Sequence, residues 1–402
     1  MNESPVALSL RTLLTPPSPI RKLAGLKTEA QKRGIKVFGL NIGQPDVETP
    51  KEFLDGVKNF DSKILAYADS EGDLALRKSL TTYMEQSAGV KVPFERILIT
   101  TGASEALIFA FMTACDPGDE VLIFDPTYAN YMGFAAVTGV RLMPIVTKIE
   151  DHFKLPESNY IEERISKRTK AILLCNPNNP TGTVYTEDEV KRLLAICNKY
   201  NLFLVVDETY RELVFDGIKQ VSVLNIEPDN PRVIVIDSLS KRFSLCGARL
   251  GFLITANQDF YQKTLNIAQA RLSSPTIEQY AANYMLNTID SNYIESVRAE
   301  YQSRRDVLFN ELTKIPSLKI TKAMGAFYSI VELPVDNAEH FAEFLLKEFS
   351  DKNETIFLAP AHGFYMSSEH GKKQVRIAYV LNEKDLKRSV EILKIALNQY
   401  CS

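Results

Sequence analysis

The chain has 402 residues, of which 45% are hydrophobic and 24% are charged, an ordinary composition for a globular protein. This length suffices for two or three domains, or for one large α/β domain with a smaller companion. The formal net charge is −3, and no basic tail or Lys/Arg cluster with interleaved aromatic residues occurs, so we expect no nucleic-acid partner.

The cysteines and the apolar segments indicate the cellular compartment of the protein. The five cysteines lie far apart and form no Cys-x-x-Cys pair, so neither a metal site nor a disulfide framework is predicted. Reduced thiols are typical of the cytosol. The first residues lack a signal-peptide pattern, and no apolar run approaches the roughly 18 residues that span a membrane. We therefore expect a cytoplasmic protein without a membrane partner.

The first 46 residues combine breaks with short elements. Three prolines within residues 16–19 exclude a continuous helix there, whereas residues 21–33 predict a short amphipathic helix. Residues 37–40 predict a strand, which runs into a Gly/Pro turn at 41–46. Gly43 in this turn would let the backbone approach a ligand closely.

From about residue 51, predicted strands alternate with helices. Residues 97–101 predict an apolar strand, Gly102-Ala103-Ser104 a tight turn, and residues 105–114 a helix. A small-residue turn that opens a helix leaves free N–H groups, which can bind an anion. Further buried strands are predicted at 121–124, 141–146, 171–175, 202–206, 233–236 and 250–254, and a helix is predicted at 187–200. This alternation indicates a mostly parallel sheet with helices on both faces.

The last part of the chain has a different pattern. Helix dominates after residue 257, and residues 293–314 predict one long helix. Beyond it we predict strands and helices in this order: strand 327–331, helix 338–349, strands 355–358 and 374–380, and helix 383–398. We interpret this part as a smaller α+β domain, packed closely on the first because no flexible linker separates them.

Unusual polar residues follow the carboxyl ends of the predicted strands, where ligands bind in parallel sheets. Lys241 follows an apolar strand, and a desolvated amine favours the neutral form that makes a Schiff base. The other strand ends carry Ser104, Tyr128, Asn179, Asp207 and Tyr210. An amine, a carboxylate, a phenol, an amide and an anion-binding turn together suit a pyridine aldehyde phosphate, because the amine holds the aldehyde and the carboxylate keeps the ring nitrogen protonated.

Seven motifs occur along nearly the whole chain from residue 20: GQPD at 43–46, TGASEAL at 101–107, DPTYANY at 125–131, NPNNPTG at 176–182, DETYREL at 207–213, SLSKRFSLCGARLGF at 238–252 and VRIAYV at 375–380. With them the chain resembles the class I/II aminotransferases of fold type I, which use pyridoxal 5′-phosphate (PLP). The resemblance implies a large PLP-binding α/β domain at residues 50–290, with a mostly parallel, seven-stranded type of sheet flanked by helices. It also implies a smaller α+β domain built from both chain ends, residues 1–49 and 291–402.

The resemblance implies a role for each cofactor-binding residue. Lys241 forms the internal aldimine and moves the proton between the substrate Cα and the cofactor. Asp207 pairs with the ring nitrogen, Tyr210 and Asn179 contact the ring hydroxyl, and Tyr128 stacks on the ring. The phosphate is held by Ala103, Ser104, Ser238 and Arg249. Ser240 either contacts the phosphate or only shapes the turn.

The resemblance also implies how substrates bind and react. The amino group of an L-amino acid passes to a 2-oxo acid, expected to be 2-oxoglutarate, by a ping-pong mechanism. Arg376 binds the substrate α-carboxylate, helped by Asn179 and the backbone at Gly43. Tyr67 matches a tyrosine that reaches the phosphate of the neighbouring subunit, which implies a homodimer with shared active sites.

Other functions remain open at this point. A PLP-dependent carbon-sulfur β-lyase uses the same fold and nearly the same residues, and it would release pyruvate and ammonia without an oxo-acid acceptor. A PLP-sensing transcription regulator would need a DNA-binding domain, for which the N-terminal 40 residues leave no room. An aldolase that forms a Schiff base without a cofactor would not need Asp207 or a phosphate site.

The side chain of the amino donor also remains open. One aspartate-specific subgroup has a lysine just after the small-residue turn, where this chain has Ser104 followed by Glu105. Arg21 or Arg271 could replace that lysine. Tyr128, Tyr131 and Phe364 would equally suit an aromatic or aliphatic donor.

Overall fold

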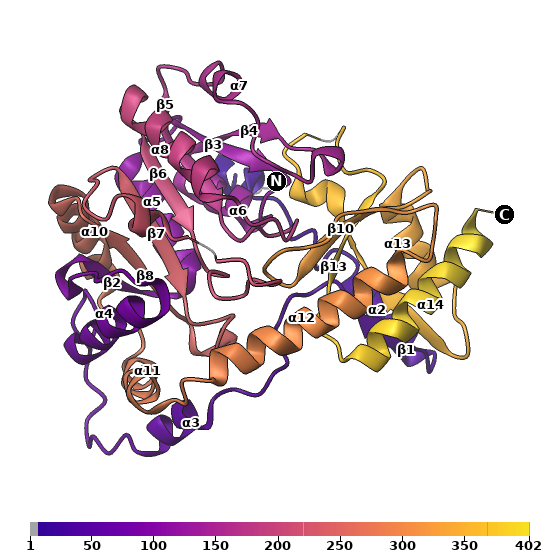
Figure 1. The fold of residues 1–402 in the computed structure, drawn as a ribbon, viewed down its shortest axis with the longest axis horizontal. Coiled ribbons are helices and arrows are strands. Elements are labelled where there is room, and N and C mark those ends of the chain that lie inside the picture. Colours follow the sequence, from indigo (N-terminus) through magenta and orange to yellow (C-terminus); the bar gives the residue numbers. More distant parts are fainter. Residues whose placement is uncertain (1–6, 220, 368, 402) are drawn as a thin grey trace, which may run out of the picture.

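The computed structural model describes residues 7–219, 221–367 and 369–401. Figure 1 shows a larger domain around a central sheet and a smaller domain around a second sheet. The 20-residue helix α12 (Tyr293–Leu312) extends from the side of the larger domain, near α11 (Thr276–Thr288), into the smaller one, where it packs on α14 (Glu383–Tyr400).

A seven-stranded sheet forms the centre of the larger domain. Its strand order is β2-β8-β7-β6-β5-β3-β4, and only β8 runs antiparallel to its neighbours. The strands are β2 (Ile97–Thr101), β3 (Glu120–Asp125), β4 (Arg141–Val146), β5 (Thr169–Cys175), β6 (Phe203–Asp207), β7 (Val233–Ser238) and β8 (Leu250–Thr255). The predicted mostly parallel sheet is confirmed.

Both faces of this sheet are buried, because helices cover each of them. In β5, Ile172 and Leu174 belong to one hydrophobic cluster, whereas Ala171 and Leu173 belong to another. Side chains of α4 (Leu74–Ala88), α8 (Glu187–Tyr200) and α11 complete the first cluster, and those of α5 (Gly102–Ala114), α6 (Asn130–Thr138) and α10 (Gln258–Arg271) contribute to the second. Each fully buried aliphatic side chain contributes about 1.5–3 kcal/mol, so the sheet is a firm base for the loops at its edge.

The smaller domain draws on both ends of the chain. Its four-stranded sheet has the order β12-β13-β10-β9, and β1 pairs in parallel with β11. Its elements are α2 (Ala24–Lys32), β1 (Lys36–Gly39), β9 (Lys319–Ile320), β10 (Tyr328–Glu332), α13 (Ala338–Lys347), β11 (Glu354–Phe357), β12 (Ala359–Pro360), β13 (Gln374–Ala378) and α14. Phe38 and Leu40 share a hydrophobic cluster with residues of α12 and α14. The predicted boundaries at residues 49/50 and 290/291 stay predictions.

Short helices complete the fold: α1 (Leu10–Leu14), α3 (Lys51–Lys58), α7 (Ser158–Glu162) and α9 (Val223–Ile226). One predicted boundary is wrong in an informative way. Helix α5 begins at Gly102, not at residue 105, because the side chain of Glu105 folds back and accepts a hydrogen bond from the Thr101 amide at 2.8 Å. Ala103 and Ser104 therefore lie in the first helical turn.

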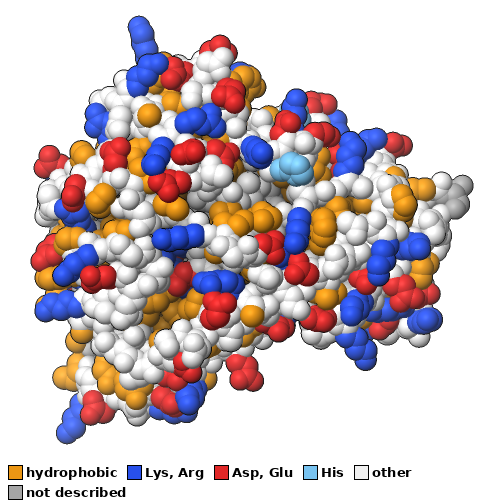
Figure 2. Space-filling view, in the orientation of Figure 1, with side chains coloured by type: hydrophobic (Ala, Val, Ile, Leu, Met, Phe, Trp, Pro, Cys, Tyr) orange, Lys and Arg blue, Asp and Glu red, His pale blue; other side chains and the backbone are white. Residues whose placement is uncertain are grey.

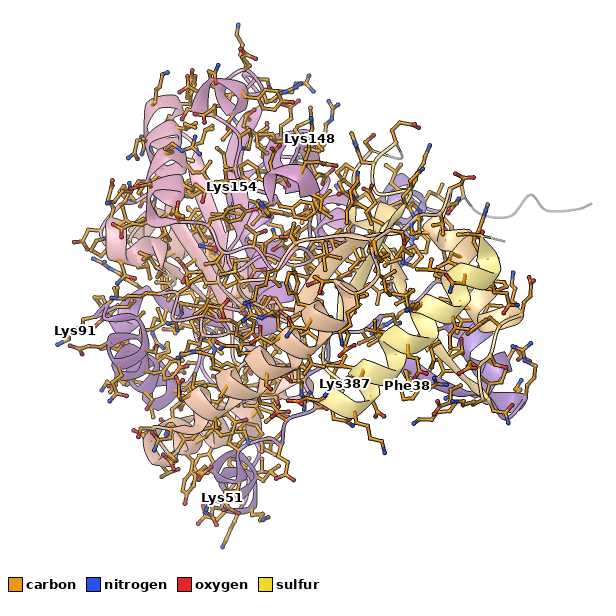
Figure 3. All side chains as sticks on the ribbon, turned by 45° about the vertical axis from the view of Figure 1, so that its right-hand side comes forward. Phe38, Lys51, Lys91, Lys148, Lys154 and Lys387 are labelled. Carbon is orange, nitrogen blue, oxygen red and sulfur yellow. The ribbon has the colours of Figure 1, made fainter. Side chains whose placement is uncertain are left out.

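The surface carries charges of both signs. Lys, Arg, Asp and Glu side chains are interspersed over the face seen in Figure 2. The lysines labelled in Figure 3, among them Lys51, Lys91 and Lys387, are exposed and come from separate parts of the chain. Within the described ranges, none of the helices combines the length and apolarity needed to cross a membrane.

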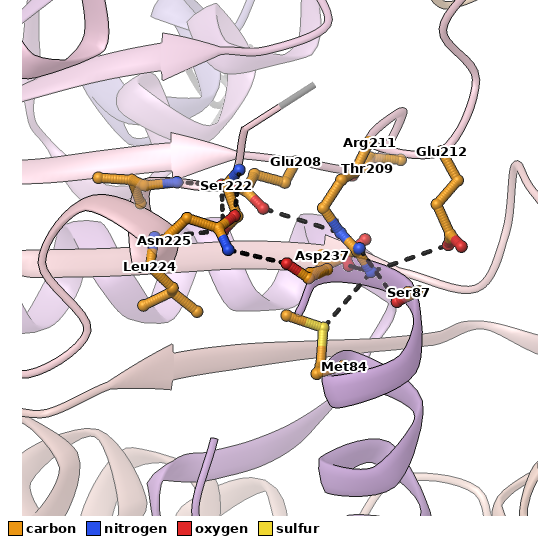
Figure 4. Close-up of polar contacts among 12 residues, drawn as sticks. Met84, Ser87, Glu208, Thr209, Arg211, Glu212, Ser222, Leu224, Asn225 and Asp237 are labelled. Atoms are coloured by element: carbon orange, nitrogen blue, oxygen red, sulfur yellow. Dashed lines mark hydrogen bonds and ion pairs between the residues drawn. The ribbon is translucent and has the colours of Figure 1, made fainter. Parts of the chain in front are cut away.

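Beneath the strand ends lies a buried charge cluster, which consists of Glu208, Arg211, Glu212, Asp237 and Arg242. The side chain of each is at most 9% exposed. Figure 4 shows Arg211 between three carboxylates, 3.6–3.8 Å from their oxygens, with Met84 and Ser87 of α4 on its other side. Arg242 pairs with Glu212 and Asp237 and donates to the Ser238 carbonyl at 3.0 Å.

The buried charge cluster joins turns that carry predicted site residues. Glu208 follows Asp207, Asp237 precedes Ser238, and Arg242 follows Lys241. Burial alone would raise the pKa of Glu212, but the guanidinium groups of Arg242 and Arg211 hold it below its usual range. Because an uncompensated buried charge costs several kcal/mol, these pairs fix the turns relative to one another.

Replacing Arg242 by Met should therefore destabilise the fold strongly. Arg242→Met leaves Asp237 with one cation fewer and Glu212 without its closest one, and breaking a buried pair costs about 3–5 kcal/mol. Urea unfolding of the purified variant measures this loss. The matched control is Lys191→Met, which breaks an exposed pair with Glu187 on α8 and should barely change the unfolding free energy. Equal stability of the two variants would contradict the prediction.

Candidate active site

A cavity of about 300 Å³ lies at the carboxyl ends of the large-sheet strands, within the size range of small-molecule sites. Ten of the eleven predicted cofactor-binding residues line it: Ala103, Ser104, Tyr128, Asn179, Asp207, Tyr210, Ser238, Ser240, Lys241 and Arg249. A second cavity of about 270 Å³ shares Tyr128, Asn179, Tyr210 and Lys241 with the first and adds the predicted substrate-binding residues Gly43 and Arg376. We call these the cofactor cavity and the substrate cavity.

Tyr67 is the predicted residue that lines neither cavity. Its side chain is 78% exposed on a loop of the large domain. Its predicted role requires a second subunit, so it stays a prediction.

Lys241 lies in a turn directly after β7, between the two cavities. Its Nζ donates to the Gly43 carbonyl at 3.0 Å and lies 3.7 Å from the Cys246 Sγ. The turn is held by Ser238, whose Oγ donates to the Leu250 carbonyl at 2.8 Å and accepts from the Ser240 amide at 3.1 Å. Ser240 Oγ lies 2.8 Å from the same hydroxyl, so Ser240 both shapes the turn and faces the cofactor cavity.

Gly43 meets Lys241 because it lacks a side chain. A Cβ at this position would lie 1.9 Å from the Tyr328 hydroxyl. That hydroxyl also points toward the Gly43 carbonyl, at 3.5 Å. The GQPD turn therefore reaches the amine only with glycine at its first position.

One end of the cofactor cavity is built for an anion. Ala103 and Ser104 open helix α5, whose first N–H groups have no partner within the helix. Arg249 has a left-handed backbone with φ 52°, and one of its guanidinium nitrogens lies 2.6 Å from where a Cβ on Gly102 would stand. A helix N-terminus, a guanidinium and two serine hydroxyls suit a phosphate group.

The other end carries a buried carboxylate. Asp207 is 5% exposed and accepts hydrogen bonds from the Tyr131 hydroxyl at 2.7 Å and the Thr209 amide at 3.1 Å. Burial raises its pKa, while these hydrogen bonds oppose the rise. No cation of the described chain pairs with it, so a protonated ring nitrogen entering the cavity would supply the missing charge. The donors around the cavity therefore fit PLP.

Tyrosines and an amide form the wall between these ends. The Tyr128 hydroxyl accepts from the Asn130 amide at 2.8 Å, and its ring meets Tyr131 edge to face at 5.4 Å. Burial raises the pKa of Tyr128. The Tyr210 hydroxyl lies 3.0 Å from that of Tyr328, and burial raises the pKa of Tyr210 as well. Tyr128 and Tyr210 therefore stay protonated and line the cavity with phenol hydroxyls.

Arg376 lines the substrate cavity, and its guanidinium group still has an unused hydrogen-bond donor. It is 1% exposed, donates to the Asn179 side chain at 3.1 Å and to the Asn41 carbonyl at 2.6 Å, and leaves its Nε without a partner. The Tyr328 ring lies 4.3 Å and the Phe364 ring 4.7 Å from the guanidinium carbon. Burial lowers the pKa of Arg376. A carboxylate is the ligand that such a buried fork favours.

Sequence reasoning missed several residues of the site: Asn41, Asn130, Thr209 and Tyr328. Tyr328 lies on the predicted strand 327–331. Its place beside the substrate cavity depends on how β10 pairs with β13, where Ile330 lies opposite Arg376, and this pairing cannot be read from the sequence. Asn41 lies in the predicted turn at 41–46, but the sequence predicts no role for its side chain.

A family model described as aminotransferase class I and II matches residues 35–393. The aspartate aminotransferase of Sulfolobus acidocaldarius is 31% identical over 381 residues, 92% of each chain. Aromatic-amino-acid aminotransferase 2 of Thermococcus litoralis is 28% identical over 401 residues, 98% of this chain and 99% of that one. The solved alanine aminotransferase from Pyrococcus furiosus matches with a TM-score of 0.90 and 28% identity, over 98% of this chain and 100% of that one.

The sequence motifs, the fold and the family match agree over nearly the whole chain. The expected cofactor, fold class and transaminase activity are thereby confirmed. The chain belongs to the class I and II aminotransferases, PLP-dependent enzymes of fold type I.

Proposed function

We propose that this aminotransferase transfers the amino group of an L-amino acid to 2-oxoglutarate in a ping-pong reaction centred on Lys241. The observation that carries the proposal is the meeting of the Lys241 amine, the unpaired carboxylate of Asp207 and an anion-binding end at one cavity. When bound, PLP supplies an electron-accepting ring that stabilises negative charge at the substrate α-carbon.

The residues of the cofactor cavity hold the cofactor in three places. Asp207 would keep the ring nitrogen protonated, because its buried carboxylate would gain a cationic partner. Tyr128 would pack on the ring, and Tyr210 and Asn179 would hydrogen-bond its hydroxyl. The phosphate is bound by the start of α5, Arg249 and the serine hydroxyls, that is by Ala103, Ser104, Ser238, Ser240 and Arg249.

Lys241 both holds the cofactor and moves a proton. Its Nζ would hold the cofactor by the aldehyde group. With substrate bound, the free Nζ would accept the α-proton of the substrate and return it as a general acid. The Gly43 carbonyl, 3.0 Å away, keeps the amine at the boundary of the two cavities during this exchange.

Arg376 orients the substrate. Its fork binds the α-carboxylate, with Asn179 and the Gly43 backbone beside it. Because the guanidinium is held by Asn41 and two aromatic rings, the α-carbon is placed near Lys241 with little loss of side-chain entropy. The β-lyase alternative is not favoured, since the relatives named above are all aminotransferases.

We also propose that the enzyme is a cytoplasmic homodimer in which Tyr67 reaches the neighbouring phosphate. Ile64, Leu65 and Tyr67 are 76%, 62% and 78% exposed, within four consecutive positions of one loop. Such a cluster of large exposed apolar side chains is typical of a protein interface. The five cysteines are all unpaired thiols, which supports a reducing compartment.

Lys241→Ala should abolish efficient turnover. Loss of a positioned acid-base group costs about 10²- to 10⁴-fold in rate, and the variant should also lose the yellow chromophore that borohydride bleaches in the wild type. Initial rates with amino donors and 2-oxoglutarate measure the first effect and absorbance spectra the second. Lys167→Ala, which removes an exposed lysine, serves as the control. Wild-type turnover by Lys241→Ala would refute the assignment.

Arg376→Lys should weaken substrate use while PLP still binds. A lysine keeps the charge but cannot form the fork, and a charge-assisted hydrogen bond is worth about 1.5–3 kcal/mol, so kcat/KM should fall about 10- to 100-fold. Steady-state kinetics and PLP titration separate the two properties. Arg388→Lys changes a guanidinium on α14 that pairs with Asp351 and Glu354 outside both cavities and should leave kcat/KM unchanged. An unaltered kcat/KM for Arg376→Lys would contradict its role.

Placing charge on the exposed loop should disrupt the proposed dimer. Ile64→Asp combined with Leu65→Asp introduces two like charges into the interface, so size-exclusion chromatography with light scattering should report a monomer. PLP affinity should fall with it, because Tyr67 of the partner no longer reaches the phosphate. The control is Val137→Asp, an exposed apolar position on α6. A double variant that remains dimeric excludes this loop from the interface.

A further inference from the structure

We propose that Arg21 binds the second carboxylate of a dicarboxylic amino acid and of its oxo acid, and so sets the substrate class of the enzyme. This inference rests on the proposed function, because it assigns the distal part of the substrate site. It concerns a residue from the N-terminal segment, far in sequence from Lys241 and Arg376.

The charge of the substrate cavity is the first observation. Its lining includes three basic residues, Arg21, Lys241 and Arg376, and no aspartate or glutamate. In the proposed reaction Lys241 meets the substrate amine and Arg376 the α-carboxylate. One cation of the cavity is then left without a partner, and a second carboxylate on the substrate would match it.

The position of Arg21 at the junction of the two cavities is the second observation. It lines both of them, as do Tyr128, Asn130 and Lys241. Among the described residues, no carboxylate forms an ion pair with the Arg21 guanidinium. Its neighbour Lys22, by contrast, points to a different partner and pairs with Glu339.

Asn41 connects the backbone just before Arg21 to the side chain of Arg376. The Asn41 carbonyl accepts from Arg376 at 2.6 Å, and the Asn41 side-chain amide donates to the Ile20 carbonyl at 3.0 Å. The backbone just before Arg21 is thus tied to the residue that fixes the α-carboxylate fork. A substrate with two carboxylates would meet two guanidinium groups in one cavity, because Arg21 and Arg376 both line it.

Packing supports the same segment from its other side. Ile20 packs against a hydrophobic cluster that contains Phe364, whose ring also lies 4.7 Å from the Arg376 guanidinium. Pro19 lies so close to Gly363 that a Cβ there would be 2.3 Å from it. The turn closes with the Arg21 amide donating to the Ser18 carbonyl at 3.1 Å. Arg21 is exposed, yet its backbone is fixed at the mouth of the site.

Arg271 is the other basic residue that could bind a second carboxylate, but its guanidinium already has other partners. Its guanidinium lies 3.3 Å from the Glu105 carboxylate and donates to the Ile99 carbonyl at 3.1 Å. It lines neither the cofactor cavity nor the substrate cavity.

The test compares four amino donors between the wild type and a variant in which a neutral side chain replaces Arg21. Arg21→Gln keeps much of the side-chain length and removes the charge. Because a charge-assisted hydrogen bond is lost, kcat/KM for aspartate and glutamate should fall about 10- to 100-fold, with the values for alanine and phenylalanine unchanged. Arg21→Lys should recover part of the loss. Lys22→Gln, one residue along and outside both cavities, should leave all four donors unaffected.

A binding measurement makes the test independent of turnover. Calorimetric titration of the PLP-loaded protein with succinate should show weaker binding by Arg21→Gln, about 10- to 100-fold, whereas butyrate, which has one carboxylate, should bind both proteins equally. Equal losses for all four donors, or unchanged succinate binding, would overturn the inference. A wild type that transaminates no donor refutes the proposed function, and the succinate titration still decides the role of Arg21.

Discussion

The buried charge cluster is the constraint on which the active site depends. Parallel strands bring their carboxyl ends to one edge, but they do not fix how the following turns lie. Arg211 and Arg242 connect the turn after β6, through Glu208 and Glu212, with the end of β7 at Asp237. A buried ion pair contributes little net stability, yet breaking one is costly. The cluster therefore acts mainly to hold the Lys241 turn beside Asp207.

Much of the fold follows from local signals in the sequence. Helix α8 and strand β4 begin and end at the predicted residues. For α8 the reason is a capping box of Thr186 and Glu189 at its start and a left-handed Asn201 at its end. The strands of the large sheet are continuous apolar runs because both sheet faces are covered, and such runs are recognisable without any knowledge of pairing. Several predicted residues of the cofactor cavity, among them Ser104, Asp207 and Lys241, are recognisable for a related reason, since they lie at or just after the ends of these strands, whereas Asn130 and Thr209 of the same cavity were missed.

The substrate cavity was less predictable because it depends on contacts distant in sequence. Arg376 was identified from its motif, but its partner Asn41 is 335 residues away. Tyr328 reaches Gly43 only through the register of β10 against β13. Helix α5 began three residues earlier than expected, because a side chain, Glu105, supplies the acceptor that the backbone alone would lack. None of these contacts leaves a periodic or compositional trace.

The two cavities also differ in how they are built, and this separates cofactor binding from substrate choice. Except for Arg21, the residues that line the cofactor cavity lie between 103 and 249. Five of them are direct sequence neighbours of the buried charge cluster: Asp207, Thr209, Tyr210, Ser238 and Lys241. The substrate cavity adds Ser18, Ile20, Ile42 to Gln44, Tyr328 and Arg376 from the chain ends. Substitutions in the segment 18–21 can thus change the charge presented to a substrate side chain without disturbing an ion pair beneath Lys241. Asn41 limits that freedom, because it bonds both to this segment and to the arginine that holds the α-carboxylate.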